Sequence, residues 1–101
     1  MTYKKGLKTM RIANTNASSY VRRRIPFKGN NLFGELLAKG YVIYSYGHHF
    51  PLFVYSVKTK RWYGNNNKYS QSTSKHKTQC GINDYVSKTT EQLQEIIKSL
   101  S

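Results

Sequence analysis

Two runs of β-branched and aromatic residues, 41–46 and 52–57, constrain the fold more than any other part of the chain. Their composition is typical of strands, because such side chains pack well on a pleated, half-buried surface. Between the runs, Gly47-His48-His49-Phe50-Pro51 combines a conformationally free glycine with a proline that lacks a backbone N–H. The stretch therefore predicts an antiparallel pair of strands joined by a bend that carries two histidines.

The C-terminal segment has a helical pattern. Its apolar residues recur at the spacing of one helix face and are Leu93, Ile96, Ile97 and Leu100. Thr89 and Gln92 fit a capping box, and Glu91 would lie near the positive end of the helix dipole. We therefore expect a helix from about residue 90 to residue 100 that packs on the sheet.

Residues 19–28 alternate with a period of two, as in a half-buried strand. One face would carry Val21, Arg23, Ile25 and Phe27, and the other Arg22, Arg24 and Lys28. Because Pro26 cannot donate to a ladder, this strand would lie at an edge or end there.

Residues 32–39 fit two interpretations. Their apolar side chains have the spacing of a short helix, and Gly40 would follow its end. Gly34 lowers helix stability by about 1 kcal/mol relative to alanine, so an extended loop is the alternative.

Beyond the strand pair, residues 58–60 predict a basic turn and residues 61–63 the start of a third strand. Residues 64–67, Gly-Asn-Asn-Asn, predict a loop. Residues 68–79 are rich in serine and lysine without apolar periodicity. We place them on the surface, as a loop or a short irregular helix.

These elements predict an α+β fold: a small antiparallel sheet of three to four strands, a C-terminal helix packed on one face, and a short helix at 32–39. At 101 residues the chain has the size of one domain. Residues 1–34 contain eight basic side chains and no acidic one. We therefore divide the chain into a basic N-terminal arm, 1–18, and a single α+β domain, 19–101.

The formal net charge is +13, from 17 basic and 4 acidic residues. Self-repulsion of this size disfavours a compact state unless an anionic partner offsets it, and nucleic acid is the commonest such partner. The charge excludes a DNA mimic, which must be acidic.

Two membrane-related patterns are absent from the sequence. No run approaches the roughly 20 apolar residues of a membrane span, and the first residues lack the apolar core of a signal peptide.

The single cysteine, Cys80, cannot form an internal disulfide. We expect a cytoplasmic protein with DNA or RNA as its partner, no membrane partner, and a host protein as a further partner class.

Cations and aromatic rings are interleaved along the predicted sheet and its loops. Lysine and arginine neutralise phosphates, and aromatic faces stack on exposed bases. Because one face of the sheet must pack against the core, some of these rings have a structural role. The residues expected to contact nucleic acid are Arg22, Arg23, Arg24, Lys28, Lys58, Lys60, Arg61, Trp62, Lys68, Tyr69, Lys75 and Lys77.

The histidines His48, His49 and His76 support an alternative function. A histidine near lysines can act as general acid or base in RNA cleavage, while cations stabilise the phosphorane charge. With Cys80 they are also zinc-ligand types, but their spacing fits no common zinc pattern, and we expect neither a metal nor another cofactor. The structural alternative is that His48 and His49 cap the bend and His76 donates to a backbone carbonyl.

Residues 40–79 contain four short features in a fixed order. They are VIYSYGHHFP at 42–51, the single tryptophan Trp62, KYS at 68–70 and TSKH at 73–76. Together they resemble an uncharacterised family of small phage or mobile-element proteins. The resemblance implies such an origin, and with it an infected or carrier bacterial host.

A second set of residues comprises Leu36-Leu37-Ala38-Lys39-Gly40-Tyr41, Gly47-His48-His49, Lys75-His76 and the helix at 90–100. Their order is similar to that in HicA-type toxins, small ribonucleases with a double-stranded-RNA-binding-like α-β-β-β-α fold. The resemblance implies catalysis by His48 or His49 with His76 assisting. The glycine–serine–histidine turn of that family has no serine here.

We therefore expect a small, basic, phage- or mobile-element-encoded protein that binds nucleic acid, holding phosphates with lysine and arginine and bases by tyrosine and tryptophan stacking. The first alternative is a metal-independent, HicA-like ribonuclease, an mRNA interferase that uses His48 or His49. The second is a host-takeover or immune-evasion protein that binds a host protein or a nucleotide signal.

Overall fold

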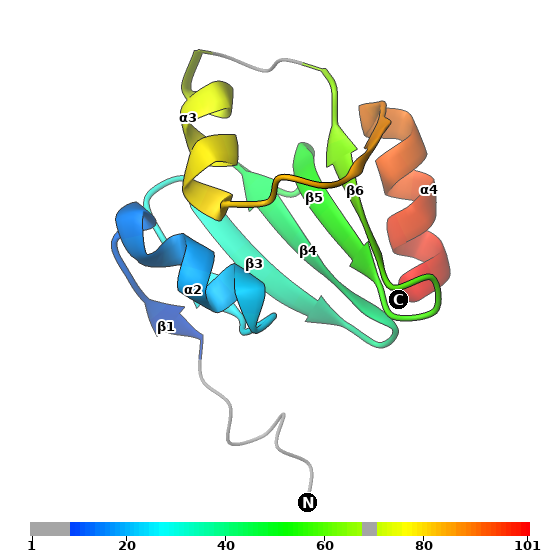
Figure 1. Cartoon of the computed structure of the whole chain (residues 1–101), viewed down its shortest axis with the longest axis horizontal. Coiled ribbons are helices and arrows are strands. Elements are labelled where there is room, and N and C mark those ends of the chain that lie inside the picture. The colour runs from blue at the N-terminus through cyan, green and yellow to red at the C-terminus, as the bar shows by residue number, and fades with distance from the viewer. Residues whose placement is uncertain (1–8, 68–70) are drawn as a thin grey trace, which may run out of the picture.

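A mixed sheet runs through the centre of the molecule (Figure 1). The computed structural model describes residues 9–67 and 71–101. Within them the sheet has seven strands, ordered β1-β2-β3-β4-β5-β6-β7. They are β1 (Met10–Arg11), β2 (Phe27–Lys28), β3 (Leu32–Leu37), β4 (Gly40–Ser45), β5 (Pro51–Ser56), β6 (Arg61–Asn65) and β7 (Val86–Lys88). The helices are η1 (Asn14–Asn16), α2 (Ala17–Arg22), α3 (Gln71–Cys80) and α4 (Thr90–Leu100).

The predicted strand pair forms the middle of this sheet. β4 and β5 are antiparallel, with Tyr41 opposite Tyr55 and Val42 opposite Val54. The bend at 46–50 joins them, as expected. The third predicted strand is also confirmed, because β6 begins at Arg61 and pairs antiparallel with β5.

The predicted size of the sheet is wrong. Strands β2 to β6 are antiparallel, but β1 pairs parallel with β2, and β7 pairs parallel with β6. The outer strands contain only two or three residues each. Runs this short carry no readable alternation, and only pairing with a longer neighbour reveals them.

Alternate residues of β4 face two separate cores. Tyr41 and Ile43 belong to a cluster that includes Ala17 and Val21 of α2 and Cys80 of α3. Val42 and Tyr44 belong to a second cluster that includes Leu93 and Leu100 of α4. The sheet is therefore covered by α2 and α3 on one face and by α4 on the other.

The C-terminal helix is confirmed. It begins after Thr89, whose side chain accepts a hydrogen bond from the backbone N–H of Gln92, and the Gln92 side chain returns a bond to the Thr89 N–H. Leu93 is fully buried in the cluster that includes Val42 and Val54, and α4 packs against β5 and β6. The predicted capping box and apolar stripe thus account for both the start of α4 and the face it buries.

The predicted strand at 19–28 is wrong over most of its length. Ala17, Tyr20 and Val21 lie on one side of α2, with Ala17 and Val21 buried. This i, i+3, i+4 pattern starts two residues before the stretch that alternates. Arg24 then adopts a positive φ of 53°, and only Phe27 and Lys28 of the predicted strand are extended in the sheet.

The predicted helix at 32–39 is also wrong, because residues 32–37 form β3. Its glycine explains why: a Cβ at Gly34 would collide with the Tyr41 hydroxyl and the Phe27 ring. The Tyr41 hydroxyl crosses this gap and donates to the carbonyl of Ile25 at 2.8 Å. Gly34 therefore allows the Tyr41 side chain of the next strand to approach its backbone closely. The apolar spacing within residues 32–39 does not reveal this contact.

Three other assignments change at their boundaries. Gly64 and Asn65 of the predicted loop belong to β6. Of the predicted surface segment 68–79, residues 71–79 are helical, in α3, and residues 68–70 lie outside the described part. Residues 10–18 of the predicted arm contribute β1, η1 and the start of α2.

None of the described helices is long and apolar enough to cross a membrane.

Candidate nucleic-acid interface

A groove of about 580 Å³ opens on the face of the sheet that carries α2 and α3. One wall comes from α2 and the residues just after it, and the opposite wall from the segment that follows α3. The residues that line it are Ser18, Val21, Arg22, Arg24, Trp62, Cys80, Gly81, Ile82, Asn83 and Asp84.

A second hollow of about 370 Å³ adjoins this groove. It is formed by the β5–β6 turn and the segment leading into β7, and its lining includes Lys60, Arg61 and Tyr85. Trp62 and Asp84 line both hollows. The two therefore form one continuous surface, which we call the Trp62 groove, with the indole at its middle.

Three neighbouring rings hold Trp62 in place. Its ring centroid lies 5.1 Å from that of Tyr55, its cross-strand partner, and 6.3 Å and 6.4 Å from those of Tyr41 and Phe53. The Tyr41 and Phe53 contacts are edge-on, at 88° and 85°. The half-buried indole is thus fixed by its packing, so that stacking a base on it costs little side-chain entropy.

Arg24 lies over the Tyr55 ring, with its guanidinium carbon 4.3 Å from the ring centroid. Its backbone is in the left-handed region, which costs a non-glycine residue roughly 1–2 kcal/mol. The cation–π contact offsets part of this cost. The guanidinium is consequently positioned beside Trp62 rather than extended freely into solvent.

The cations around the Trp62 groove form no ion pair within the described residues. Arg22, Arg24, Lys60 and Arg61 are all exposed. The two ion pairs in the described part of the chain, His48–Glu35 and Lys98–Glu95, lie elsewhere. Four cations around a fixed indole form a surface suited to phosphates flanking a stacked base.

The structure distributes the other predicted contact residues over several surfaces. Arg23 is exposed and does not line the groove, and Lys77 lies over the Tyr85 ring at 5.5 Å. Lys28 lines a cavity with Glu35, and Lys58 lines a hollow beside α4. Lys75 lines a further hollow with His76, and Lys68 and Tyr69 lie outside the described residues.

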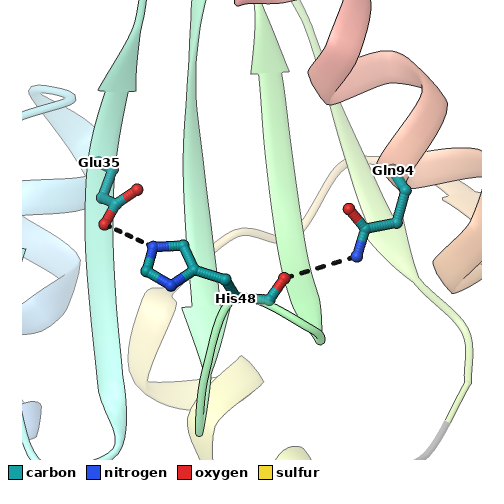
Figure 2. A network of polar contacts seen from close by, with 3 residues as sticks. All are labelled: Glu35, His48 and Gln94. Carbon is teal, nitrogen blue, oxygen red and sulfur yellow. Dashed lines mark hydrogen bonds and ion pairs between the residues drawn. The ribbon is translucent and has the colours of Figure 1, made fainter.

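His48 is held between β3 and α4 (Figure 2). Its Nε2 lies 2.9 Å from a carboxylate oxygen of Glu35, and its ring centroid is 4.7 Å from that of Tyr44. The Gln94 side-chain amide donates to the His48 carbonyl at 3.5 Å. This arrangement fixes one nitrogen of a side chain that is 67% exposed.

His76 lies on the other face of the sheet. Its Nδ1 is 2.7 Å from the hydroxyl of Ser45, and both residues are buried. Burial, with a smaller contribution from the charge of Lys75, lowers the pKa of His76 below its ordinary range. Because Tyr44 and Ser45 are successive strand residues that point to opposite faces, the structure does not bring His48 and His76 together.

The chemistry of a metal site is not assembled in the described part. No group of three or more His, Cys, Asp or Glu side chains lies together there. Cys80 is buried, and burial raises the pKa of its thiol to about 12. Its thiolate form, which binds zinc, is therefore disfavoured.

Sequence reasoning missed three features of these sites. It did not place Asp84 or Asn83 in the Trp62 groove, because both lie in an irregular segment that only the fold brings beside Trp62. It also missed the Glu35–His48 and Ser45–His76 contacts, which join residues 13 and 31 positions apart. One feature of the sequence could have indicated Asp84 and Glu35. The chain has only 4 acidic residues, so each of them stands out among the many cations.

Comparison of the chain with models of known families, with curated proteins and with solved structures gives no match.

Proposed function

We propose that this is a small phage- or mobile-element-encoded protein that binds single-stranded nucleic acid along the Trp62 groove. The observation that carries the proposal is the convergence of Arg22, Arg24, Lys60 and Arg61 around one fixed, half-buried indole. The cations would hold successive phosphates, and Trp62 would stack with an unpaired base. The expected origin rests on the resemblance of residues 40–79 to small phage proteins.

The electrostatic part of binding follows from the unpaired cations. Each lysine or arginine that meets a phosphate releases condensed counterions, which makes affinity fall as salt rises. The four acids of the chain do not counter this effect evenly, because Glu91 and Glu95 lie on α4, across the sheet. Asp84 is the one acid that lines the Trp62 groove, against the four cations Arg22, Arg24, Lys60 and Arg61, so the groove keeps an excess of positive charge for a polyanion.

The position of Trp62 favours single strands over duplexes. In a duplex the faces of the bases are covered by their neighbours, whereas an unpaired base can lie on an aromatic ring. Such stacking contributes about 1–3 kcal/mol per base and tolerates any sequence. A single base inserted beside Trp62 would leave its flanking phosphates near Arg24 and Arg61.

The test uses Trp62 as its own probe, since it is the single tryptophan of the chain. Titration with a single-stranded oligonucleotide is expected to quench its fluorescence, because stacking changes the surroundings of the indole. Polyphosphate, which has charge but no bases, is the control and should bind without comparable quenching. Equal affinity for the single strand and its duplex, or an unchanged indole signal, would contradict the proposal.

A second candidate function, a HicA-like ribonuclease, is favoured by the Glu35–His48 contact. Glu35 orients the imidazole, and Lys28 lines the same cavity of about 380 Å³ with both residues. A carboxylate that orients a histidine next to a lysine can support proton transfer and charge stabilisation in RNA cleavage.

Incubation of RNA with the protein and with a His48→Ala variant separates the two functions. A nuclease would cleave RNA and lose that activity in the variant, while His49→Ala, at the neighbouring histidine, would retain it. RNA that stays intact with the unmodified protein eliminates this candidate.

A further inference from the structure

One acidic residue lies in the middle of the basic groove. Asp84 lines both halves of the Trp62 groove, together with Trp62 itself. Its carboxylate is exposed and makes no hydrogen bond or ion pair with any described residue. A surface that only attracted phosphates would bind them more tightly without this charge.

Asp84 is suited to a base edge rather than to the backbone. A carboxylate offers two acceptor oxygens and no donor. Guanine is the one common base whose Watson–Crick edge presents two adjacent donors, N1–H and the N2 amino group. Its O6 and N7 acceptors match an arginine, which is a frequent bidentate partner of guanine.

The Trp62 groove holds all three groups that such a base requires. Trp62 supplies a stacking surface, Asp84 an acceptor pair, and Arg22 or Arg24 a guanidinium lining the same space. The volume of about 580 Å³ is within the range of about 300–1,000 Å³ that is usual for small-molecule sites. The groove is therefore suited in size and in chemistry to one unstacked nucleotide of a single strand.

We propose that the Trp62 groove selects guanine in a single strand, with Asp84 as the residue that determines this specificity. The inference rests on the proposed nucleic-acid binding and adds the identity of the base. Phosphate contacts position the strand without reading its sequence, and Asp84 reads the base that stacks on Trp62.

The experiment compares three short RNAs: five uridines, and the same strand with guanosine or with inosine at its centre. The guanosine strand is expected to bind roughly five- to 150-fold more tightly, the range that one good bidentate base contact gives. Inosine at the centre lacks the N2 amino group and should lose most of this preference. Equal affinity for the guanosine, inosine and all-uridine strands would overturn the inference.

Asp84→Asn is the decisive variant, with Glu95→Gln as its matched control. Both remove one negative charge, but Glu95 lies on α4 and is absent from the groove lining. Asp84→Asn is expected to remove most of the guanosine preference, because asparagine keeps only one acceptor oxygen, while the all-uridine strand binds as well as before or better. Glu95→Gln should leave the ratio of the two affinities unchanged.

The outcomes separate this inference from the proposed function. If every RNA binds, but the ratio of affinities is the same in Asp84→Asn and in the unmodified protein, the inference fails and nucleic-acid binding stands. If no RNA binds at all, both fail.

Discussion

The guanidinium carbon of Arg24 lies 4.3 Å from the centroid of the Tyr55 ring, and the centroid of that ring lies 5.1 Å from the centroid of Trp62. A cation and an indole are thereby held by one shared tyrosine. Nucleic-acid binding requires contacts to phosphates and contacts to bases. This geometry places a group for each side by side, the Arg24 guanidinium for a phosphate and the Trp62 indole for a base.

Replacing Arg24 with lysine tests this relationship without changing the net charge. Lysine has no planar guanidinium to lie on Tyr55, so the positive charge loses its fixed position. We expect oligonucleotide affinity to fall about two- to fivefold, which corresponds to the 0.5–1 kcal/mol of an exposed cation–π contact. Arg23→Lys, at the exposed neighbour outside the groove lining, is the control and should bind normally; an equal loss in both variants would contradict the assignment.

Replacing Trp62 with leucine should weaken binding by about 1–3 kcal/mol through the loss of base stacking. The salt dependence of binding should stay the same, because no charge is removed. A fluorophore on the oligonucleotide provides the signal. Tyr63→Leu removes the adjacent ring, which faces α4, and should leave affinity unchanged.

The stability of the fold should depend on pH through His76. Its lowered folded-state pKa means that the unfolded chain binds a proton more readily, so the free energy of unfolding should fall as pH drops below about 6.5. Urea denaturation at pH 7.5 and pH 5.5 measures the difference. A His76→Gln variant should show a smaller pH effect, and His49→Gln, at an exposed histidine, the full effect; identical pH effects in these two variants would be inconsistent with the assignment.

Replacing Gly34 with alanine should destabilise the protein by about 1–3 kcal/mol, the usual cost of overpacking. The new methyl group would meet the Tyr41 hydroxyl and the Phe27 ring, both in the core. Gly47→Ala is the comparison, because its Cβ would approach only the exposed His49 ring, at 3.0 Å. Thermal denaturation of the two variants gives the measurement, and a Gly34→Ala protein as stable as Gly47→Ala would refute the steric account.

The parts of the fold that sequence predicted are those whose causes are local. The helix α4 follows from its own cap at Thr89 and its own apolar stripe, and β4 and β5 from their own composition. Gly34 shows the opposite case. Its role depends on Tyr41, a residue of the next strand, so that spacing within 32–39 indicated a helix where the chain forms a strand.

The same distinction applies to the candidate sites. The count of charges found Arg22, Arg24, Lys60 and Arg61, and the count of aromatic rings found Trp62, because their side-chain chemistry is visible one residue at a time. The counts gave no means of separating them from Lys28, Lys58 or Lys75, which the fold places on other surfaces. They also passed over Asp84, whose significance comes from its neighbours rather than from its own type.

The most direct test of the account is the salt dependence of single-strand binding. If Arg22, Arg24, Lys60 and Arg61 each meet one phosphate of the all-uridine strand, which has no guanine for an arginine to bind, the logarithm of the binding constant should fall with the logarithm of salt concentration with a slope of about −3. The Arg22→Ala/Arg24→Ala variant should reduce this slope by about 1.4, and Lys39→Ala/Lys98→Ala, two exposed lysines outside the groove, should retain it. A slope near zero, or equal losses in the two variants, would contradict nucleic-acid binding at the Trp62 groove.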